Sequence, residues 1–163
     1  ANATDPAAAQ NTIENSKNTG NVIGSTNIGG IAGESKGTIT QCRNDGQVSK
    51  VAGVICKTVN LGGLVGKNGE AARLSNSKNY GNVNSETDTL VNLGGICGIL
   101  YNNSIVELCE NNGAISGSGK EIIPNEDTNT NCASCTSNNG GSASTDDFGQ
   151  LNIGIIYGKY QEI

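Results

Sequence analysis

The chain contains no histidine, no tryptophan and no methionine, and its 163 residues include a single phenylalanine, Phe148. Without histidine, the Ser–His–Asp and Cys–His nucleophilic schemes are excluded, together with histidine-ligated zinc or iron. Aromatic residues make up 3% of the chain and hydrophobic residues 34%, which is too little bulk for a conventional globular core. We therefore expect a fold that buries a thin apolar column and makes many tight turns.

Strong positive charge and long apolar runs are also missing. Ten Lys and Arg residues stand against 15 Asp and Glu residues, and the net charge is −5 with no clustered basic segment. A nucleic-acid binder should carry such a segment, because phosphate neutralisation dominates its affinity. No apolar run approaches the roughly 20 residues that cross a bilayer. We therefore expect no nucleic-acid partner and no membrane span.

What the sequence does contain is an internal repeat, and this repeat decides the predicted fold. One motif, the double-glycine motif, occurs as NIGGIAG (Asn27–Gly33), NLGGLVG (Asn60–Gly66), NLGGICG (Asn92–Gly98) and, incompletely, NIGIIYG (Asn152–Gly158). A second, the single-glycine motif Asn-x-Gly-x-(Val/Ile), occurs as NTGNV (Asn18–Val22), NDGQV (Asn44–Val48), NYGNV (Asn79–Val83) and NNGAI (Asn111–Ile115). Because the two motifs alternate, we interpret them as two sides of one repeating coil.

Alignment on the glycines of the single-glycine motif reveals further columns. An apolar residue lies seven positions before each glycine, a small residue four before, and Val or Ile two after. The columns are Ile13/Ile39/Leu74/Val106, Ser16/Cys42/Ser77/Cys109 and Val22/Val48/Val83/Ile115. The pattern predicts an all-β fold, a parallel β-helix (β-solenoid) of about three to four rungs stacked about 4.8 Å apart. The alternative is an antiparallel sandwich or meander, in which the Asn-Gly pairs mark ordinary hairpins.

Stacked columns predict which residues hold the coil together. Two asparagine ladders are expected, Asn18/Asn44/Asn79/Asn111 and Asn27/Asn60/Asn92/Asn152. Asparagine tolerates left-handed backbone geometry, and its amide can donate to one neighbouring rung while it accepts from the other. An aliphatic core column is expected from Ile31, Leu64, Ile96 and Ile156. Cys97 falls in the column of Ala32, Val65 and Tyr157, and we interpret it as a core filler.

The segments GGIAG, GGLVG and GGICG are followed by a hydrophobic strand, a Cys or Ser, and then Asn-x-Gly-x-Val. In this order they resemble the GLUG repeats of bacterial surface proteins, which occur in adhesin-like proteins and in non-catalytic parts of immunoglobulin A peptidases. The resemblance covers roughly residues 13–115 and returns at 152–158. It implies a right-handed parallel β-helix and an extracellular, cell-wall-associated setting.

Outside the repeat, residues 1–12 are polar and alanine-rich and are expected to form an arm or a cap. We expect residues 13–163 to form a single solenoid domain with a long loop insertion at 116–151. Loops of this length are usually functional or disordered, so a recognition site is expected there first. Within the insertion, Glu126-Asp127 and Asp146-Asp147 are candidate calcium ligands, although neither has a dedicated calcium-loop spacing. No other cofactor is expected.

The six cysteines hint at an oxidising compartment. Cys132 and Cys135 form a C-x-x-C, which is read as a local disulfide, as separate disulfides that tie the insertion to Cys56 or another thiol, or as free thiols. Cys42 and Cys109 share a column two rungs apart, about 10 Å, which is beyond the reach of a disulfide. They are expected to be buried and reduced.

These observations favour a non-enzymatic structural or adhesive module on the cell surface or outside the cell, whose protein or glycan ligand the sequence does not identify. An alternative is the self-assembling subunit of an extracellular filament, because an open solenoid has two exposed strand edges at which copies could add head to tail. A third is a carbohydrate-active β-helix enzyme that uses carboxylates as acid and base. The dispersed acids and the few aromatic residues argue against that third function.

Overall fold

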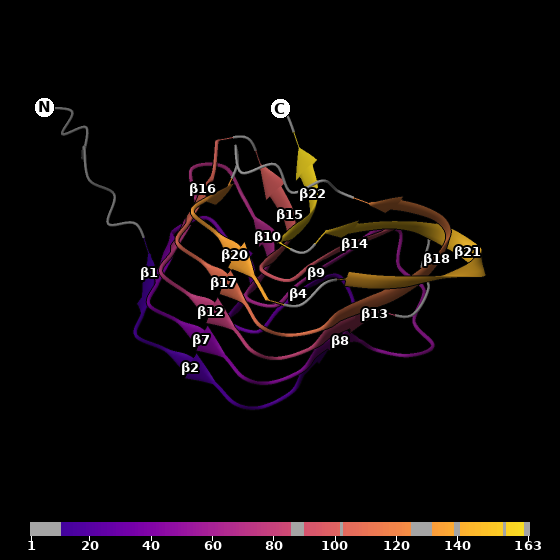
Figure 1. The fold of residues 1–163 in the computed structure, drawn as a ribbon, viewed down its shortest axis with the longest axis horizontal. Coiled ribbons are helices and arrows are strands. Elements are labelled where there is room, and N and C mark those ends of the chain that lie inside the picture. Colours follow the sequence, from indigo (N-terminus) through magenta and orange to yellow (C-terminus); the bar gives the residue numbers. More distant parts are fainter. Residues whose placement is uncertain are drawn as a thin grey trace, which may run out of the picture.

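A computed structural model of the chain describes residues 11–85, 90–101, 103–124, 132–138, 141–154 and 156–161. These residues form an all-β structure with four sheets (Figure 1). Every strand pair within the described residues is parallel. No helix that could cross a membrane occurs in this part of the chain.

The strands of each sheet come from successive repeats. The first sheet contains β1 (Thr12–Glu14), β6 (Thr38–Thr40), β11 (Arg73–Ser75), β16 (Ile105–Glu107) and β19 (Cys132–Ala133). The second contains β2 (Lys17–Asn18), β7 (Arg43–Asn44), β12 (Lys78–Asn79), β17 (Glu110–Asn111) and β20 (Thr136–Ser137). The third contains β5 (Ala32–Ser35), β10 (Val65–Asn68), β15 (Cys97–Tyr101) and β22 (Tyr157–Gln161). Figure 1 shows the second sheet as a stack that rises from β2 to β20.

The fourth sheet is the largest and has eight strands. In spatial order they are β3 (Val22–Gly24), β8 (Val48–Lys50), β13 (Val83–Ser85), β18 (Ile115–Pro124), β21 (Gly141–Gly154), β14 (Leu90–Gly94), β9 (Val59–Gly62) and β4 (Asn27–Gly29). Its two longest strands, β18 and β21, extend beyond the rest of the stack on one side (Figure 1).

Strand register follows the columns read from the sequence. In the first sheet the paired positions are Ile13, Ile39, Leu74 and Val106 in succession. In the fourth they are Val22, Val48, Val83 and Ile115. Equivalent residues of successive turns therefore lie over one another, which is consistent with the predicted β-solenoid. The antiparallel sandwich or meander is wrong for the described strands.

Two apolar clusters form the core. One is built from the first and third sheets and includes Leu64, Ile96 and Ile156 of the predicted core column, with Ile31 partly buried against it. The other is built from the fourth sheet. Full burial of one such side chain stabilises the fold by about 1.5–3 kcal/mol. Each turn contributes only a few such side chains, so each turn depends on the adjacent turns to bury them.

Much of the stretch expected to be a loop insertion, 116–151, is strand. β18 continues to Pro124, and β19, β20 and part of β21 add a further, degenerate turn. Its in-register pairs are Val106↔Cys132, Asn111↔Ser137 and Ile115↔Gly141. This turn pairs with the preceding one because its residues keep the spacing of the repeat. It does so although Ser137 stands in the Asn column and Gly141 in the Val/Ile column. The arm expected at 1–12 lies almost wholly outside the described residues.

Candidate functional site

The asparagines of the single-glycine motif form one continuous column, the first ladder. Each Nδ2 donates to the Oδ1 of the next asparagine, and the steps Asn18→Asn44, Asn44→Asn79 and Asn79→Asn111 measure 2.8, 2.9 and 2.8 Å. The last three asparagines are 0% exposed. Each Nδ2 also donates to the carbonyl of the glycine two residues later, so the same amide holds its own corner.

The asparagines of the double-glycine motif form a second ladder that runs in the opposite sense. Here the later residue donates to the earlier one, and the steps Asn60→Asn27, Asn92→Asn60 and Asn152→Asn92 each measure 2.7 Å. The structure therefore brings together every predicted ladder residue. The first ladder also continues to Ser137, whose hydroxyl accepts from Asn111 Nδ2 at 3.2 Å.

The two motifs also meet each other across the coil. The second glycine of the double-glycine motif packs against the ladder asparagine of the following single-glycine motif, Gly30 against Asn44 and Gly63 against Asn79. A methyl group on either glycine would overlap the asparagine amide or a backbone carbonyl. This close approach gives the paired glycines a structural role.

Three cysteines are buried thiols in the cluster of the first and third sheets: Cys42, Cys97 and Cys109. Burial raises the pKa of Cys97 well above its usual range and that of Cys109 to about 11. Because the thiolate is the nucleophile, both groups are poor nucleophiles near neutral pH.

The C-x-x-C segment carries the disulfide chemistry. Cys135 is disulfide-bonded, whereas Cys56 is in no disulfide, so the predicted tie from the insertion to Cys56 is wrong. The two residues are kept apart because Cys56 packs against the cluster of the fourth sheet and Cys135 against the other cluster. The side chain of Cys132 lies outside the described residues.

Metal-binding groups do not gather in the part of the chain that the structure describes, where no three His, Cys, Asp or Glu side chains lie close enough to hold an ion. The candidate calcium ligands Glu126 and Asp127 lie outside the described residues, as do the side chains of Asp146 and Asp147.

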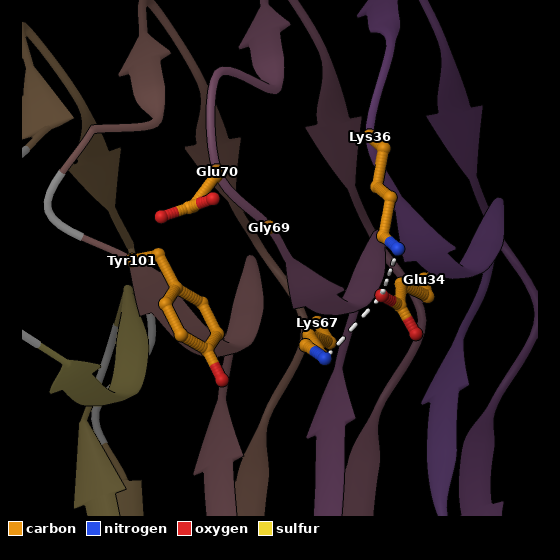
Figure 2. Close-up of a pocket in the computed structure, with 6 residues that line it drawn as sticks. All are labelled: Glu34, Lys36, Lys67, Gly69, Glu70 and Tyr101. Atoms are coloured by element: carbon orange, nitrogen blue, oxygen red, sulfur yellow. Dashed lines mark ion pairs between the residues drawn. The ribbon is translucent and has the colours of Figure 1, made fainter. Parts of the chain in front are cut away.

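A hollow of about 370 Å³ opens at the surface beside β5, β10 and β15. We call it the charged hollow, and its lining residues are Glu34, Lys36, Lys67, Gly69, Glu70 and Tyr101. Figure 2 shows Tyr101 on one side of the charged hollow and Lys36 on the other, with Lys67 between them.

Ion pairs and a turn position the polar groups of the charged hollow. Glu34 Oε1 lies 3.3 Å from Lys67 Nζ and 3.8 Å from Lys36 Nζ, so one carboxylate holds both ammonium groups. Lys67 Nζ also lies 5.5 Å from the centre of the Tyr101 ring. Glu70 stands in a turn that the Ala72 amide closes by donating to the Gly69 carbonyl at 3.2 Å. Its carboxylate has no ion pair or hydrogen bond among the described residues.

The second sheet carries a different charged surface, in which the charges satisfy one another. Asp45 pairs with Lys17 at 2.9 Å and with Arg43, and these hydrogen bonds lower the pKa of Asp45. The guanidinium of Arg43 in turn lies 4.3 Å from the centre of the Tyr80 ring. Asp45 and Tyr80 of this surface are therefore already in contact with charged partners within the chain.

The sequence did not predict the charged hollow, which lies outside residues 116–151, where a recognition site was expected first. A signal was present, since Glu34 and Lys67 occupy the same position after successive double-glycine motifs and are paired in register. Glu70 and Tyr101 follow no such column.

Comparison with known proteins adds no relative. No family model, curated protein or solved structure matches this chain.

Proposed function

We propose that this chain is a non-enzymatic structural and adhesive module that works outside the cell or at its surface. In finer detail, we propose a right-handed β-solenoid of about three to four full turns, of the GLUG-repeat type. The observation that carries the proposal is the burial of the first ladder: Asn44, Asn79 and Asn111 are fully buried and linked without a break. A stack held in this way is suited to keeping its outer side chains in fixed positions.

The disulfide at Cys135 supports an extracellular setting, because disulfides persist in oxidising compartments and are rare in the cytosol. The raised pKa values of Cys97 and Cys109 support a structural role for the buried thiols, since nucleophilic catalysis needs a thiolate. The missing histidine removes the commonest general base from the whole sequence.

The test couples the purified chain to fluorescent beads and measures their retention on intact cells. Beads that carry the chain should be retained above beads that carry an unrelated β-sheet protein of similar charge. In parallel, the chain is incubated with a panel of polysaccharides and the release of reducing ends is measured. Equal retention of the two bead types would overturn the adhesive function, and release of reducing ends would overturn the non-enzymatic one.

A second candidate, assembly into a filament, is favoured by the open first turn. Ile13 is 38% exposed, whereas Ile39, its partner in the next turn, is 1% exposed. Within the part of the chain that the structure describes, the strands of this first turn, β1 to β5, all lie at sheet edges, and such edges are templates for further pairing.

Light scattering over a range of concentrations tests this second candidate. Wild-type chain should grow in mass with concentration, and Ile13→Lys, which places a charge on the open turn, should remain monomeric. The matched control is Ile105→Lys, at a side chain that is 47% exposed in an inner turn, and it should assemble like wild type. A wild-type chain that stays monomeric at high concentration would rule the filament out.

A further inference from the structure

The described lining of the charged hollow has no net charge to select an ion. It contains two lysines and two glutamates, Lys36, Lys67, Glu34 and Glu70, whose formal charges cancel. Because Glu34 pairs with both ammonium groups and Glu70 balances the positive charge that remains, this lining gives an anionic ligand no net attraction. A cation would meet Lys67 beside the Tyr101 ring. The lining therefore fits a neutral ligand.

The same lining is rich in hydrogen-bonding capacity that hydroxyl groups can use. An ammonium group has three donors, and a carboxylate has two acceptor oxygens with about four lone-pair sites. Glu34 uses one oxygen for both lysines, and Glu70 uses none among the described residues. A ligand with several hydroxyls, each both donor and acceptor, could bond to both kinds of group at once.

Tyr101 supplies the apolar part of the charged hollow. An aromatic ring with a polar tip offers a flat surface to C–H groups and a hydroxyl to water or ligand. Ligand sites in general combine such apolar surface with a few placed polar groups in volumes of about 300–1,000 Å³. The volume of about 370 Å³ falls at the low end of that range. This size suits one or two rings rather than a long chain.

We propose that the charged hollow binds a neutral saccharide, one or two sugar units long, with a ring packed on Tyr101 and hydroxyls bonded to Glu70 and Lys67. The inference rests on the proposed function, because it names the partner that an adhesive module would present this surface to. Since the ligand is small and the site is open on one side, the dissociation constant is on the order of 10 µM to 1 mM.

Tyr80 provides a matched control on the second sheet. It is 40% exposed and belongs to the same residue type, but its ring is covered by Arg43. Truncating Tyr80 should therefore remove a comparable amount of surface aromatic without touching the charged hollow.

The experiment measures binding by isothermal titration and ligand-observed NMR with neutral oligosaccharides of hexose and N-acetylhexosamine units, and with oligouronates as the anionic probe. At least one neutral oligosaccharide should bind wild-type chain, and Tyr101→Ala should weaken binding by about tenfold or more. Tyr101→Phe should stay within about threefold of wild type, since stacking is retained. Glu70→Gln should weaken binding, and Tyr80→Ala should leave it unchanged.

Several outcomes would overturn the inference: no binding of any neutral oligosaccharide, preference for the oligouronates, or equal effects of Tyr101→Ala and Tyr80→Ala. Circular dichroism of each variant confirms that it is folded. The bead assay separates this inference from the proposed function. If Tyr101→Ala beads are retained on cells as well as wild type, adhesion stands and the saccharide site is wrong.

Discussion

Replacing Asn79 by alanine tests the first ladder at a fully buried position with a ladder asparagine on either side. The substitution removes the bonds that link Asn79 to Asn44 and Asn111, and also its 2.8 Å bond to the Gly81 carbonyl. A net hydrogen bond contributes about 1 kcal/mol, and a buried group left without its partner costs about 1–3 kcal/mol. Some of these groups keep another partner, because Asn44 Nδ2 still donates to Gly46. We expect the free energy of unfolding to fall by about 3–5 kcal/mol.

The matched variant is Asn18→Ala at the open end of the same ladder. Among the described residues Asn18 makes one ladder bond and bonds to Gly20, and water can replace these bonds because the contacts are exposed or partly exposed. Asn18→Ala should therefore lower the free energy of unfolding by only about 1 kcal/mol. Both variants are measured by urea unfolding followed by far-ultraviolet circular dichroism, with equal m-values as the sign that only stability has changed. If Asn79→Ala were no more costly than Asn18→Ala, the buried amide column would not be what holds the turns together.

Asn79→Asp gives the same test a pH dependence. A carboxylate would aim acceptors at Asn111 Oδ1 and at the Gly81 carbonyl, where the amide now donates. Burial and these acceptors raise the folded-state pKa of the new Asp above its unfolded value of about 3.9. Its stability relative to Asn79→Ala should therefore be greatest below about pH 4 and be lost as pH rises through the folded-state pKa. A stability difference that does not change with pH would contradict this reasoning.

Three further substitutions follow from other parts of the chain. Asn68→Leu should raise the free energy of unfolding in urea by about 1–3 kcal/mol, because Asn68 is fully buried and neither atom of its amide has a hydrogen-bond partner among the described residues. A loss of stability would contradict this. Leu108→Asn should raise the melting temperature, because Leu108 has a left-handed backbone (φ 51°) and its side chain is 54% exposed. A left-handed conformation costs leucine about 1–2 kcal/mol and is tolerated by asparagine. An unchanged melting temperature would show that this strain is absent. The C-x-x-C spacing leads us to expect that Cys132 is the disulfide partner of Cys135, so Cys132→Ser should free Cys135 to pair with Cys109. The turns of Cys135 and Cys109 are adjacent and in register at a Cα separation of about 4.8 Å. Mass spectrometry of the non-reduced digest should find that bond, and two free thiols would contradict the prediction.

The columns could be predicted from the sequence because each depends on one local rule repeated. A glycine lies two positions after each of Asn44, Asn79 and Asn111. The same bond, from the asparagine amide to the carbonyl of that glycine, is required at each corner. The parallel, in-register pairing could be predicted for the same reason, because like residues that stack on one another recur at equivalent positions of successive turns.

The degenerate turn and the charged hollow were missed for different reasons. In the turn formed by β19 and β20, Ser137 stands where the ladder rule expects asparagine, so the single-glycine motif does not mark this turn. Even so, Cys132 and Cys135 keep the spacing of the apolar and small columns. The charged hollow depends on corners of unequal length after β5, β10 and β15, which no periodic rule describes.

The opposed senses of the two ladders have an electrostatic consequence. A peptide unit carries a dipole of about 3.5 D, and amide side chains resemble it. In the first ladder the N–H groups point towards later turns, and in the second they point towards earlier turns. The axial dipoles of the two amide columns therefore oppose each other, unlike the aligned peptides of an α-helix. Additional turns would therefore lengthen the stack without building up opposite partial charges at its two ends. The electrostatic potential of the stack is then set by the charged side chains along its sides.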